Sequence, residues 1–147
     1  MEWMTQLQGQ IVGLDTAPLI YFIEENPVYV HLTDAFFEAM SRGEFRVVTS
    51  VLTLTEALVY PLRQGNLALA QQYRDILFNQ ASLTTIEVFP DIAEIAAQLR
   101  AVHNLRSLDA IQMATAIREG ASFFLTNDVR LPSLPGLTVL VLEELRV

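Results

Sequence analysis

The 147-residue chain contains no cysteine and no lysine, and it has only two histidines. Without cysteine there is no disulfide framework, no thiolate nucleophile and no zinc–thiolate site. Without lysine the chain does not match P-loop proteins, phosphoaspartate receivers or haloacid-dehalogenase-type phosphatases, because each of these classes uses a lysine at its reacting centre. His31 and His103 lie far apart in the sequence, which disfavours a histidine metal site or a Ser/His/Asp triad.

Positive charge is also scarce. Nine arginines stand against seventeen acidic residues, and the formal net charge is −8. The arginines are spread from Arg42 to Arg146, which argues against a protein that holds nucleic acid on a broad basic surface. A nuclease whose metal ions offset a local acidic cluster remains open.

Long apolar runs are missing as well. No stretch reaches the ~18 residues that a membrane span needs, and Asp15, Glu56 and Asp109 interrupt the clearest ones. The first residues lack the basic segment of a signal peptide, so we expect a cytoplasmic protein. The apolar fraction is nevertheless 52% and the mean hydropathy +0.34, and this surplus predicts a homodimer or another partner surface.

Strand-like and helix-like segments alternate along the chain. Short apolar runs predict strands at residues 11–14, 46–49, 83–88, 122–125 and 137–142. Helical patterns predict helices from about 18 to 26, at 28–40, from a cap at Ser50 or Thr53 to about 62, at 67–78 after Asn66, at 91–102 behind an Asp91–Glu94 capping box, and at 108–118 after Ser107. This alternation predicts one α/β domain over residues 1–147, with a parallel sheet of about five strands covered by helices on both faces.

Four carboxylates fall where the predicted elements meet: Asp15, Glu56, Asp109 and Asp128. Each adjoins an apolar run, and acidic groups are costly to bury unless they are compensated. Sites in parallel sheets form at the carboxyl ends of the strands, so the four can meet at one rim. Oxygen ligands of this kind select hard ions. The sequence therefore predicts a site for Mg²⁺ or Mn²⁺.

Each carboxylate also has a purely structural interpretation. Asp15 suits a helix cap, Asp109 a partner for a helix dipole, and Asp128 a turn after Asn127. Glu56 either points to solvent or reaches into the rim. Each alone is a weak signal, and the four together favour a ligand cluster.

Several neighbours of the carboxylates are candidates for substrate or supporting contacts. Arg106 lies three residues before Asp109 and would hold a phosphate or that carboxylate. Thr126 and Asn127 would orient the metal ligands or close a turn. Trp3 is expected to be exposed or packed on a partner.

Four strings carry a resemblance to a known family. They are an apolar strand ending in Asp15-Thr16, the pattern Ser50-x-x-Thr53-x-x-Glu56, the pattern Leu105-x-x-x-Asp109-Ala-x-x-x-Ala-x-Ala, and Leu125-Thr126-Asn127-Asp128. In this order they resemble the PIN domain family, and within it the VapC-type toxins of bacterial toxin–antitoxin pairs. The resemblance spans Ile11 to Leu142.

The resemblance implies a Rossmann-like sheet and a metal-dependent endoribonuclease. Asp15, Glu56, Asp109 and Asp128 would match the family's acidic quartet and bind Mg²⁺ or Mn²⁺. Thr16, Thr53, Arg106, Thr126 and Asn127 would contact substrate or support these ligands. It also implies an RNA substrate and an antitoxin partner that covers the pocket.

The chain differs from the family pattern at two places, and other functions are alternatives to a ribonuclease. Ala17 stands where many relatives have Asn or Ser, and the last motif runs on into Val129-Arg130-Leu131-Pro132, where relatives often place Lys or Phe. The main rival is a catalytically weak PIN-like module for binding or interaction. A metal-dependent phosphatase or a flap-type nuclease would keep the site, although the chain leaves little room for a DNA-gripping subdomain.

Overall fold

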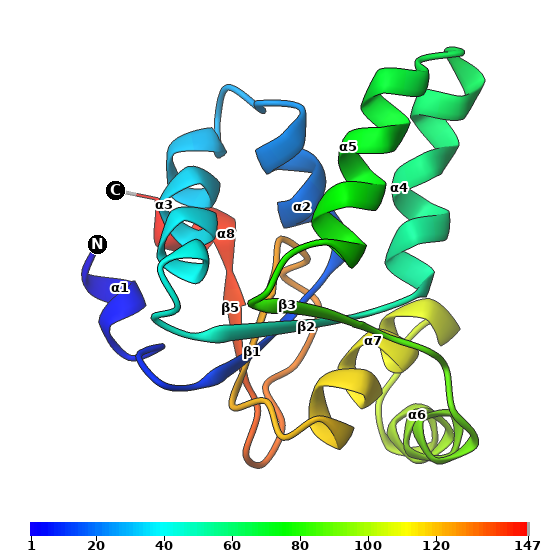
Figure 1. Cartoon of the computed structure of the whole chain (residues 1–147). Coiled ribbons are helices and arrows are strands. Elements are labelled where there is room, and N and C mark those ends of the chain that lie inside the picture. Colours follow the sequence, from blue (N-terminus) through cyan, green and yellow to red (C-terminus); the bar gives the residue numbers. More distant parts are fainter. Residues whose placement is uncertain (147) are drawn as a thin grey trace.

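A five-stranded parallel sheet forms the centre of the molecule in the computed structural model, which describes residues 1–146 (Figure 1). The strands are β1 (Ile11–Leu14), β2 (Arg46–Ser50), β3 (Leu83–Ile86), β4 (Phe123–Thr126) and β5 (Thr138–Val141). Their order is β3-β2-β1-β4-β5, and every neighbouring pair is parallel. The predicted fold class and number of strands are confirmed.

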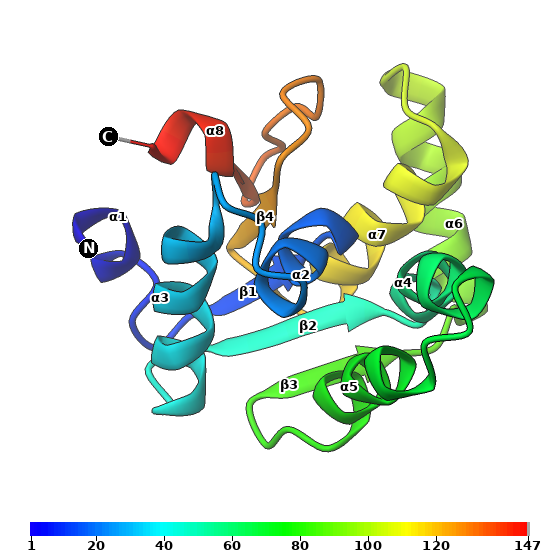
Figure 2. The same ribbon diagram turned by 90° about the horizontal axis from the view of Figure 1, so that it is seen from above.

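Helices cover both faces of this sheet (Figures 1 and 2). They are α1 (Glu2–Thr5), α2 (Thr16–Ile23), α3 (Val30–Ser41), α4 (Leu52–Arg63), α5 (Leu67–Phe78), α6 (Pro90–Val102), α7 (Ser107–Arg118) and α8 (Leu142–Leu145). One buried cluster joins the sheet to α2, α3 and α5, and a second joins it to α6 and α7. None of the helices in residues 1–146 is long and apolar enough to cross a bilayer.

The strand order reverses direction at the centre of the sheet. The chain runs outward from β1 to β2 and β3, then returns to place β4 on the other side of β1. The Asp15 amide, just after β1, donates to the Leu125 carbonyl in β4 at 2.9 Å. Ligands of such sheets bind at this switch point, outside the carboxyl ends of the strands. The fold thus opens a site beside Asp15.

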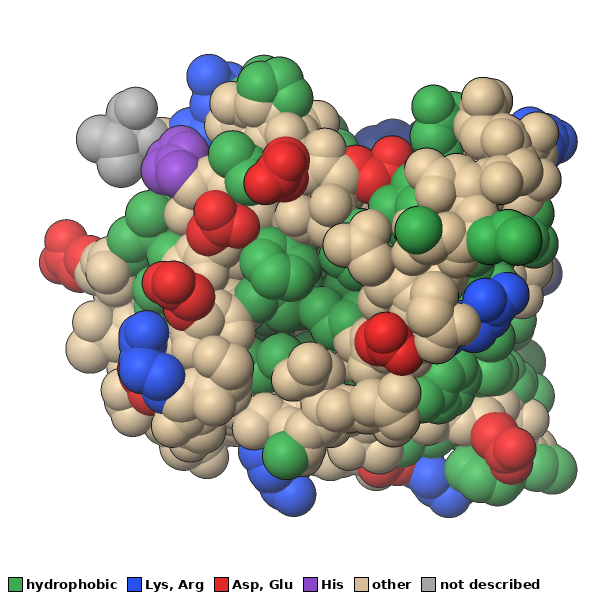
Figure 3. All heavy atoms as spheres, turned by 45° about the horizontal axis from the view of Figure 1, so that its top comes forward, with side chains coloured by type: hydrophobic (Ala, Val, Ile, Leu, Met, Phe, Trp, Pro, Cys, Tyr) green, Lys and Arg blue, Asp and Glu red, His purple; other side chains and the backbone are tan. Residues whose placement is uncertain are grey.

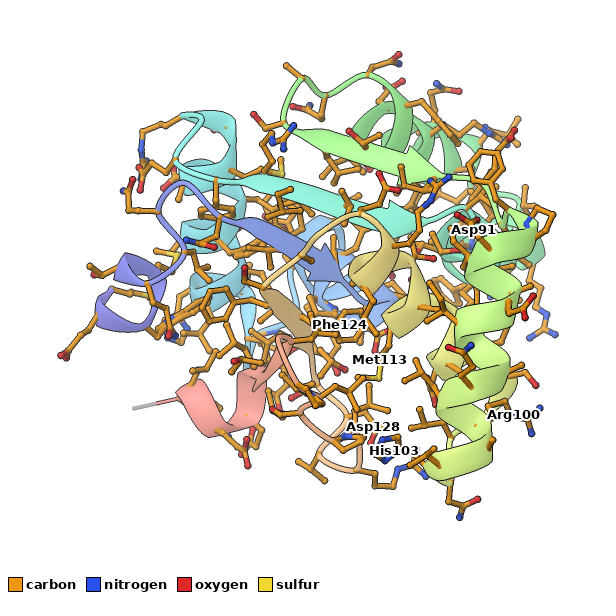
Figure 4. The ribbon with its side chains drawn as sticks, turned by 90° about the horizontal axis from the view of Figure 1, so that it is seen from below. Asp91, Arg100, His103, Met113, Phe124 and Asp128 are labelled. Atoms are coloured by element: carbon orange, nitrogen blue, oxygen red, sulfur yellow. The ribbon has the colours of Figure 1, made fainter. Side chains whose placement is uncertain are left out.

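Helix α7 lies unusually close to β1, at Gly13. A Cβ atom at Gly13 would stand 2.5 Å from the Ala116 Cβ and 2.8 Å from a ring carbon of Phe124. Ala110, Ala114 and Ala116 give α7 a buried face of small side chains. Figure 4 shows Met113 and Phe124 between α7 and the sheet, where both are fully packed. This contact holds the C-terminal half of α7 on β1 and so helps to set the line of the helix whose first turn carries Asp109.

Three local predictions are wrong. No capping box forms at Asp91, because α6 begins at Pro90 and the Asp91 carboxylate instead pairs with Arg118 at 3.0 Å. Ser107 does not cap α7, whose N-cap is Arg106. Trp3 is partly buried rather than exposed, and it stacks on Phe36 of the same chain with ring centroids 6.4 Å apart. For Asp91 and Trp3, tertiary contacts decide the outcome.

Some element ends also shift. β3 ends at Ile86, two residues before its predicted end, and Leu142 begins α8 instead of ending β5. The predicted Asn66 cap is confirmed, with its side chain accepting a hydrogen bond from the Leu69 amide at 3.0 Å. Ser50 acts near the start of α4, where its hydroxyl accepts from the Leu52 amide at 3.2 Å.

Candidate active site

A cavity of about 460 Å³ opens at the carboxyl edge of the sheet, and all four predicted carboxylates line it. Four of the predicted neighbours, Thr16, Arg106, Thr126 and Asn127, line it too. The remaining lining residues are Ala17, Ile20, Tyr21 and Val129. The carboxylates come from four separate places in the chain, and the strand order brings them together.

Asp15 is held by hydrogen bonds to both of its carboxylate oxygens. Its Oδ1 accepts from the Thr16 amide at 2.8 Å, and its Oδ2 accepts from the Thr126 hydroxyl at 2.7 Å. Asp15 is the N-cap of α2, so the structural interpretation of this residue is confirmed without excluding the other. Each carboxylate oxygen retains a lone-pair direction toward the cavity.

The pKa of Asp15 is raised above its ordinary value. Burial is the main cause, and the negative charges of Asp109 and Glu56 add to it. The hydrogen bonds from Thr126 and Thr16 act in the opposite direction. The site is therefore short of positive charge at its inner end.

Glu56 points into the rim rather than away from it. It lies in the second turn of α4, and its Oε1 accepts a hydrogen bond from the Thr16 hydroxyl at 2.9 Å. Thr16 thus connects two of the carboxylates, through its amide to Asp15 and through its hydroxyl to Glu56. This pair spans 40 residues of sequence.

Thr53, expected either to contact substrate or to support the ligands, is not among the residues that line the cavity. Its side chain is fully buried, 2.7 Å from the Thr49 hydroxyl, and it accepts from the Gln112 amide group at 2.8 Å. Thr49 in turn donates to the Leu14 carbonyl at 2.8 Å. The sequence analysis missed Gln112, a buried polar residue inside α7 that ties α4 to the sheet beneath Glu56.

Arginine side chains form ion pairs with Asp109 and Asp128. Arg106 Nε donates to Asp109 at 3.0 Å. Arg130 donates two guanidinium hydrogen bonds to Asp128, from Nε to Oδ1 at 2.9 Å and from Nη2 to Oδ2 at 2.8 Å. The Arg130 backbone amide donates a third, to Oδ1 at 3.0 Å. The Arg130 hydrogen bond is the main cause that lowers the pKa of Asp128 to about 2.

Arg130 is the most consequential residue that the sequence analysis left without a role. It appeared only as part of a difference from the family pattern, yet it occupies both oxygens of a predicted metal ligand. An arginine two residues after the last aspartate of the motif was the available signal. Its meaning depends on the turn after β4, which folds the side chain back onto Asp128.

Asn127 ties the rim to its surroundings. Its amide group donates to the Tyr21 hydroxyl at 3.2 Å, and its Oδ1 accepts from the Glu143 amide at 2.9 Å. Tyr21 stacks on Tyr29 with ring centroids 4.8 Å apart. Both polar ends of Asn127 are thereby used to fix the loop after β4.

The donor set fits a hard divalent cation in its chemistry. The acidic side chains of the cavity are all carboxylates, and the negative charges of Asp109 and Glu56 contribute to the raised pKa of Asp15. Within residues 1–146, however, no three acidic or histidine side chains stand in a geometry that holds one ion. Arg130 contacts both oxygens of Asp128, whereas Arg106 contacts only Oδ2 of Asp109 and leaves Oδ1 available. Asp15 and Glu56 form no ion pair within residues 1–146.

One face of the molecule carries few positively charged side chains. In Figure 3, hydrophobic side chains form the floor of a hollow, and acidic side chains gather around it. Arginines appear only toward the edges of this view. The expectation that no broad basic surface exists holds for this face.

The model of the PIN domain family matches residues 12–137, and the chain therefore belongs to the PIN domain family. The match includes all four carboxylates. No curated protein sequence matches the chain.

Solved structures share the fold at low sequence identity. VapBC2 from Rickettsia felis, bound to a DNA fragment from its promoter, aligns with a TM-score of 0.69 at 19% identity over 89% of this chain and 98% of that one. DNA-bound VapBC from Salmonella typhimurium gives 0.66 and 21%, over 91% and 98%. Mycobacterium tuberculosis VapC20, a toxin that cleaves the sarcin–ricin loop, gives 0.63 and 17%, over 78% and 86%. At these identities the likeness establishes the fold alone.

Proposed function

We propose that this PIN domain is a divalent-metal-dependent endoribonuclease and the toxin of a toxin–antitoxin pair, acting in the cytoplasm as one domain over residues 1–147. The observation that carries the proposal is the meeting of Asp15, Glu56, Asp109 and Asp128 in one cavity at the switch point of the sheet. The likeness to VapC20, a toxin that cleaves the sarcin–ricin loop, supports it.

The chain supplies ligands and orientation rather than a proton-transferring side chain. Asp15 and Glu56 would be the ligands free of arginine, held in place by the Thr126 and Thr16 hydroxyls. Asp109 and Asp128 would complete the set. A bound Mg²⁺ or Mn²⁺ would activate a water molecule and offset the charge of the scissile phosphate. In-line attack would leave 5′-phosphate and 3′-hydroxyl ends.

We further propose an antitoxin as the protein partner. Structures of VapBC2 from Rickettsia felis and of a Klebsiella pneumoniae toxin–antitoxin complex contain chains of this fold, and the present chain covers 98% and 96% of them. An antitoxin segment that offers a cation to the acidic cavity would block access of RNA. The homodimer expected from the apolar composition stays a prediction.

Cleavage of RNA is the direct test. A pool of single-stranded and transfer RNA is incubated with Mg²⁺, Mn²⁺ or EDTA, using wild type, Asp109→Asn, and Asp34→Asn as a control on the exposed face of α3. We expect cleavage only with metal, loss of most activity in Asp109→Asn, and no loss in the control. The fragments should carry 5′-phosphates.

A second function, that of a PIN-like binding module, is favoured by the two arginines that neutralise Asp109 and Asp128. It predicts folded, antitoxin-free protein that cleaves no RNA with either metal. That result would replace the nuclease proposal.

A further inference from the structure

A second, smaller cavity adjoins the acidic one. It has a volume of about 220 Å³, and it shares Arg106, Asp109 and Asp128 with the larger cavity. Its remaining lining residues are Asn104, Leu105, Arg130 and Leu131. Figure 4 shows Asp128 on the side of the molecule where α6 ends at His103. We call this second space the side cavity, and Asp109 and Asp128 form its common wall with the site.

Both arginines of the side cavity are anchored only through those shared carboxylates. The Arg106 and Arg130 side chains are each 71% exposed, while Asp109 and Asp128 are 14% and 20% exposed. Arg106 is held through one nitrogen and Arg130 through two. Ion pairs of such exposed side chains contribute little to stability, so a change of partner costs little. A phosphate group offers the guanidinium the same two-oxygen geometry as a carboxylate.

The negative charge of the protein opposes RNA binding. The chain has a net charge of −8, and a strand with one phosphate among the four carboxylates places its neighbouring phosphates close by. These phosphates need positive charge on the protein to bind. Among the residues that line the two cavities, Arg106 and Arg130 are the only cations. They stand on one side of the site, in the α6–α7 and β4–β5 connections.

We propose that the side cavity is a phosphate subsite. It binds the backbone phosphate of a nucleotide adjacent to the cleaved bond, with Arg106 and Arg130 exchanging Asp109 and Asp128 for the phosphate oxygens and the Asn104 amide as a further donor. The exchange frees the two carboxylates at the moment when substrate arrives. This inference rests on the proposed nuclease function, and it assigns the direction in which the RNA strand leaves the acidic cavity.

Binding of a short fluorescent single-stranded RNA tests the subsite, with fluorescence anisotropy measured over a range of salt concentrations. All proteins carry Asp15→Asn to prevent cleavage. The test variant adds Arg106→Ala and Arg130→Ala. The matched control adds Arg42→Ala and Arg118→Ala, which remove the same charge from exposed ion pairs before β2 and β4, at the opposite edge of the sheet. Thermal unfolding confirms that each protein is folded.

We expect the test variant to bind RNA about tenfold or more weakly than the control. The slope of log K against log salt should fall by about 1.4, because each cation that contacts a single strand contributes about 0.7. Replacing both arginines by lysine should keep the slope but lose part of the affinity, since lysine lacks the planar fork.

Equal affinity and equal slope in the test variant and the control would reject the subsite. Cleavage of the same RNA by wild type, measured in parallel, separates this outcome from failure of the nuclease itself. If wild type cleaves RNA while the salt slopes of the test variant and the control agree, only the subsite proposal is rejected. Wild type that neither cleaves nor binds RNA overturns both proposals.

Discussion

At the scale of single residues, the four carboxylates of this PIN domain are not equivalent. Asp15 is half-buried and has a raised pKa, whereas Asp128 is paired with Arg130 and has a pKa of about 2. The inner carboxylate is therefore costly to ionise, and the outer one is ionised at every physiological pH. This gradient suits a site in which added positive charge is most needed near Asp15.

The raised pKa makes a stability prediction for Asp15→Asn. A folded-state pKa above the ordinary 3.8 means that the folded protein favours the protonated form, so this contribution to stability is complete below that value and is lost as the pH rises through the folded pKa. We expect Asp15→Asn, which mimics the protonated form, to have a higher Tm than wild type at pH 7.

The gain should shrink as the pH falls through the raised pKa of folded Asp15, and it should vanish below the ordinary value of 3.8. Thermal unfolding followed by circular dichroism from pH 3 to 8 measures both effects. Asp34→Asn on the exposed face of α3 serves as the control. A gain in Tm that is equal at pH 7 and pH 3 would contradict the assignment of the shift to ionised Asp15.

At the scale of secondary-structure elements, α7 is the part that couples the core to the site. Its small-residue face packs on β1, Gln112 connects it to α4, and Asp109 lies in its first turn. A shift of α7 away from the sheet would carry Asp109 away from Asp15. The position of this helix depends on the lack of a side chain at Gly13.

We expect Gly13→Ala to destabilise the fold by about 1–3 kcal/mol, because overpacking a close contact forces the surrounding backbone to move. The new Cβ would lie 2.5 Å from the Ala116 Cβ. Urea unfolding measures the loss. Adding Ala116→Gly should restore part of it, although glycine inside a helix itself costs about 1 kcal/mol. Equal stability of wild type and Gly13→Ala would show that α7 does not rest on β1 as described.

At the scale of the whole molecule, four carboxylates in one cavity predict that a bound divalent ion stabilises the fold. Binding to the native state alone adds about 2.7 kcal/mol at a ligand concentration of 100 Kd. For a chain of this size each kcal/mol corresponds to a Tm rise of roughly 2–4 °C. Addition of Mn²⁺ should therefore raise Tm by several degrees, and EDTA should reverse the change.

Screening provides the control for this measurement. Sodium chloride at matched ionic strength also reduces repulsion among the carboxylates, so only the excess of the Mn²⁺ effect over the salt effect reports specific binding. The excess should be small in Glu56→Gln, since Glu56 lines the cavity and forms no ion pair within residues 1–146. An equal response to both salts would argue against a metal site.

The amino-acid sequence predicted the sheet well because the signals are local. Short apolar runs mark the strands, and Pro27, Asn66 and Gly120 lie between consecutive elements, so the boundaries can be read without reference to tertiary structure. Helix starts at Asp91 and Ser107 were misplaced because a capping preference competes with other partners. Asp91 finds Arg118, 27 residues away.

What the sequence alone determined is the order of strands and helices, the lack of histidine, cysteine and lysine chemistry, and the position of one acidic residue at each of four element junctions. Only the tertiary structure decided which groups meet. The placement of β4 beside β1 brings the Thr126 hydroxyl to Asp15 across 111 residues. The fold of the turn after β4 directs Arg130 onto Asp128. Both contacts depend on backbone geometry that distant segments impose, and no local pattern encodes it.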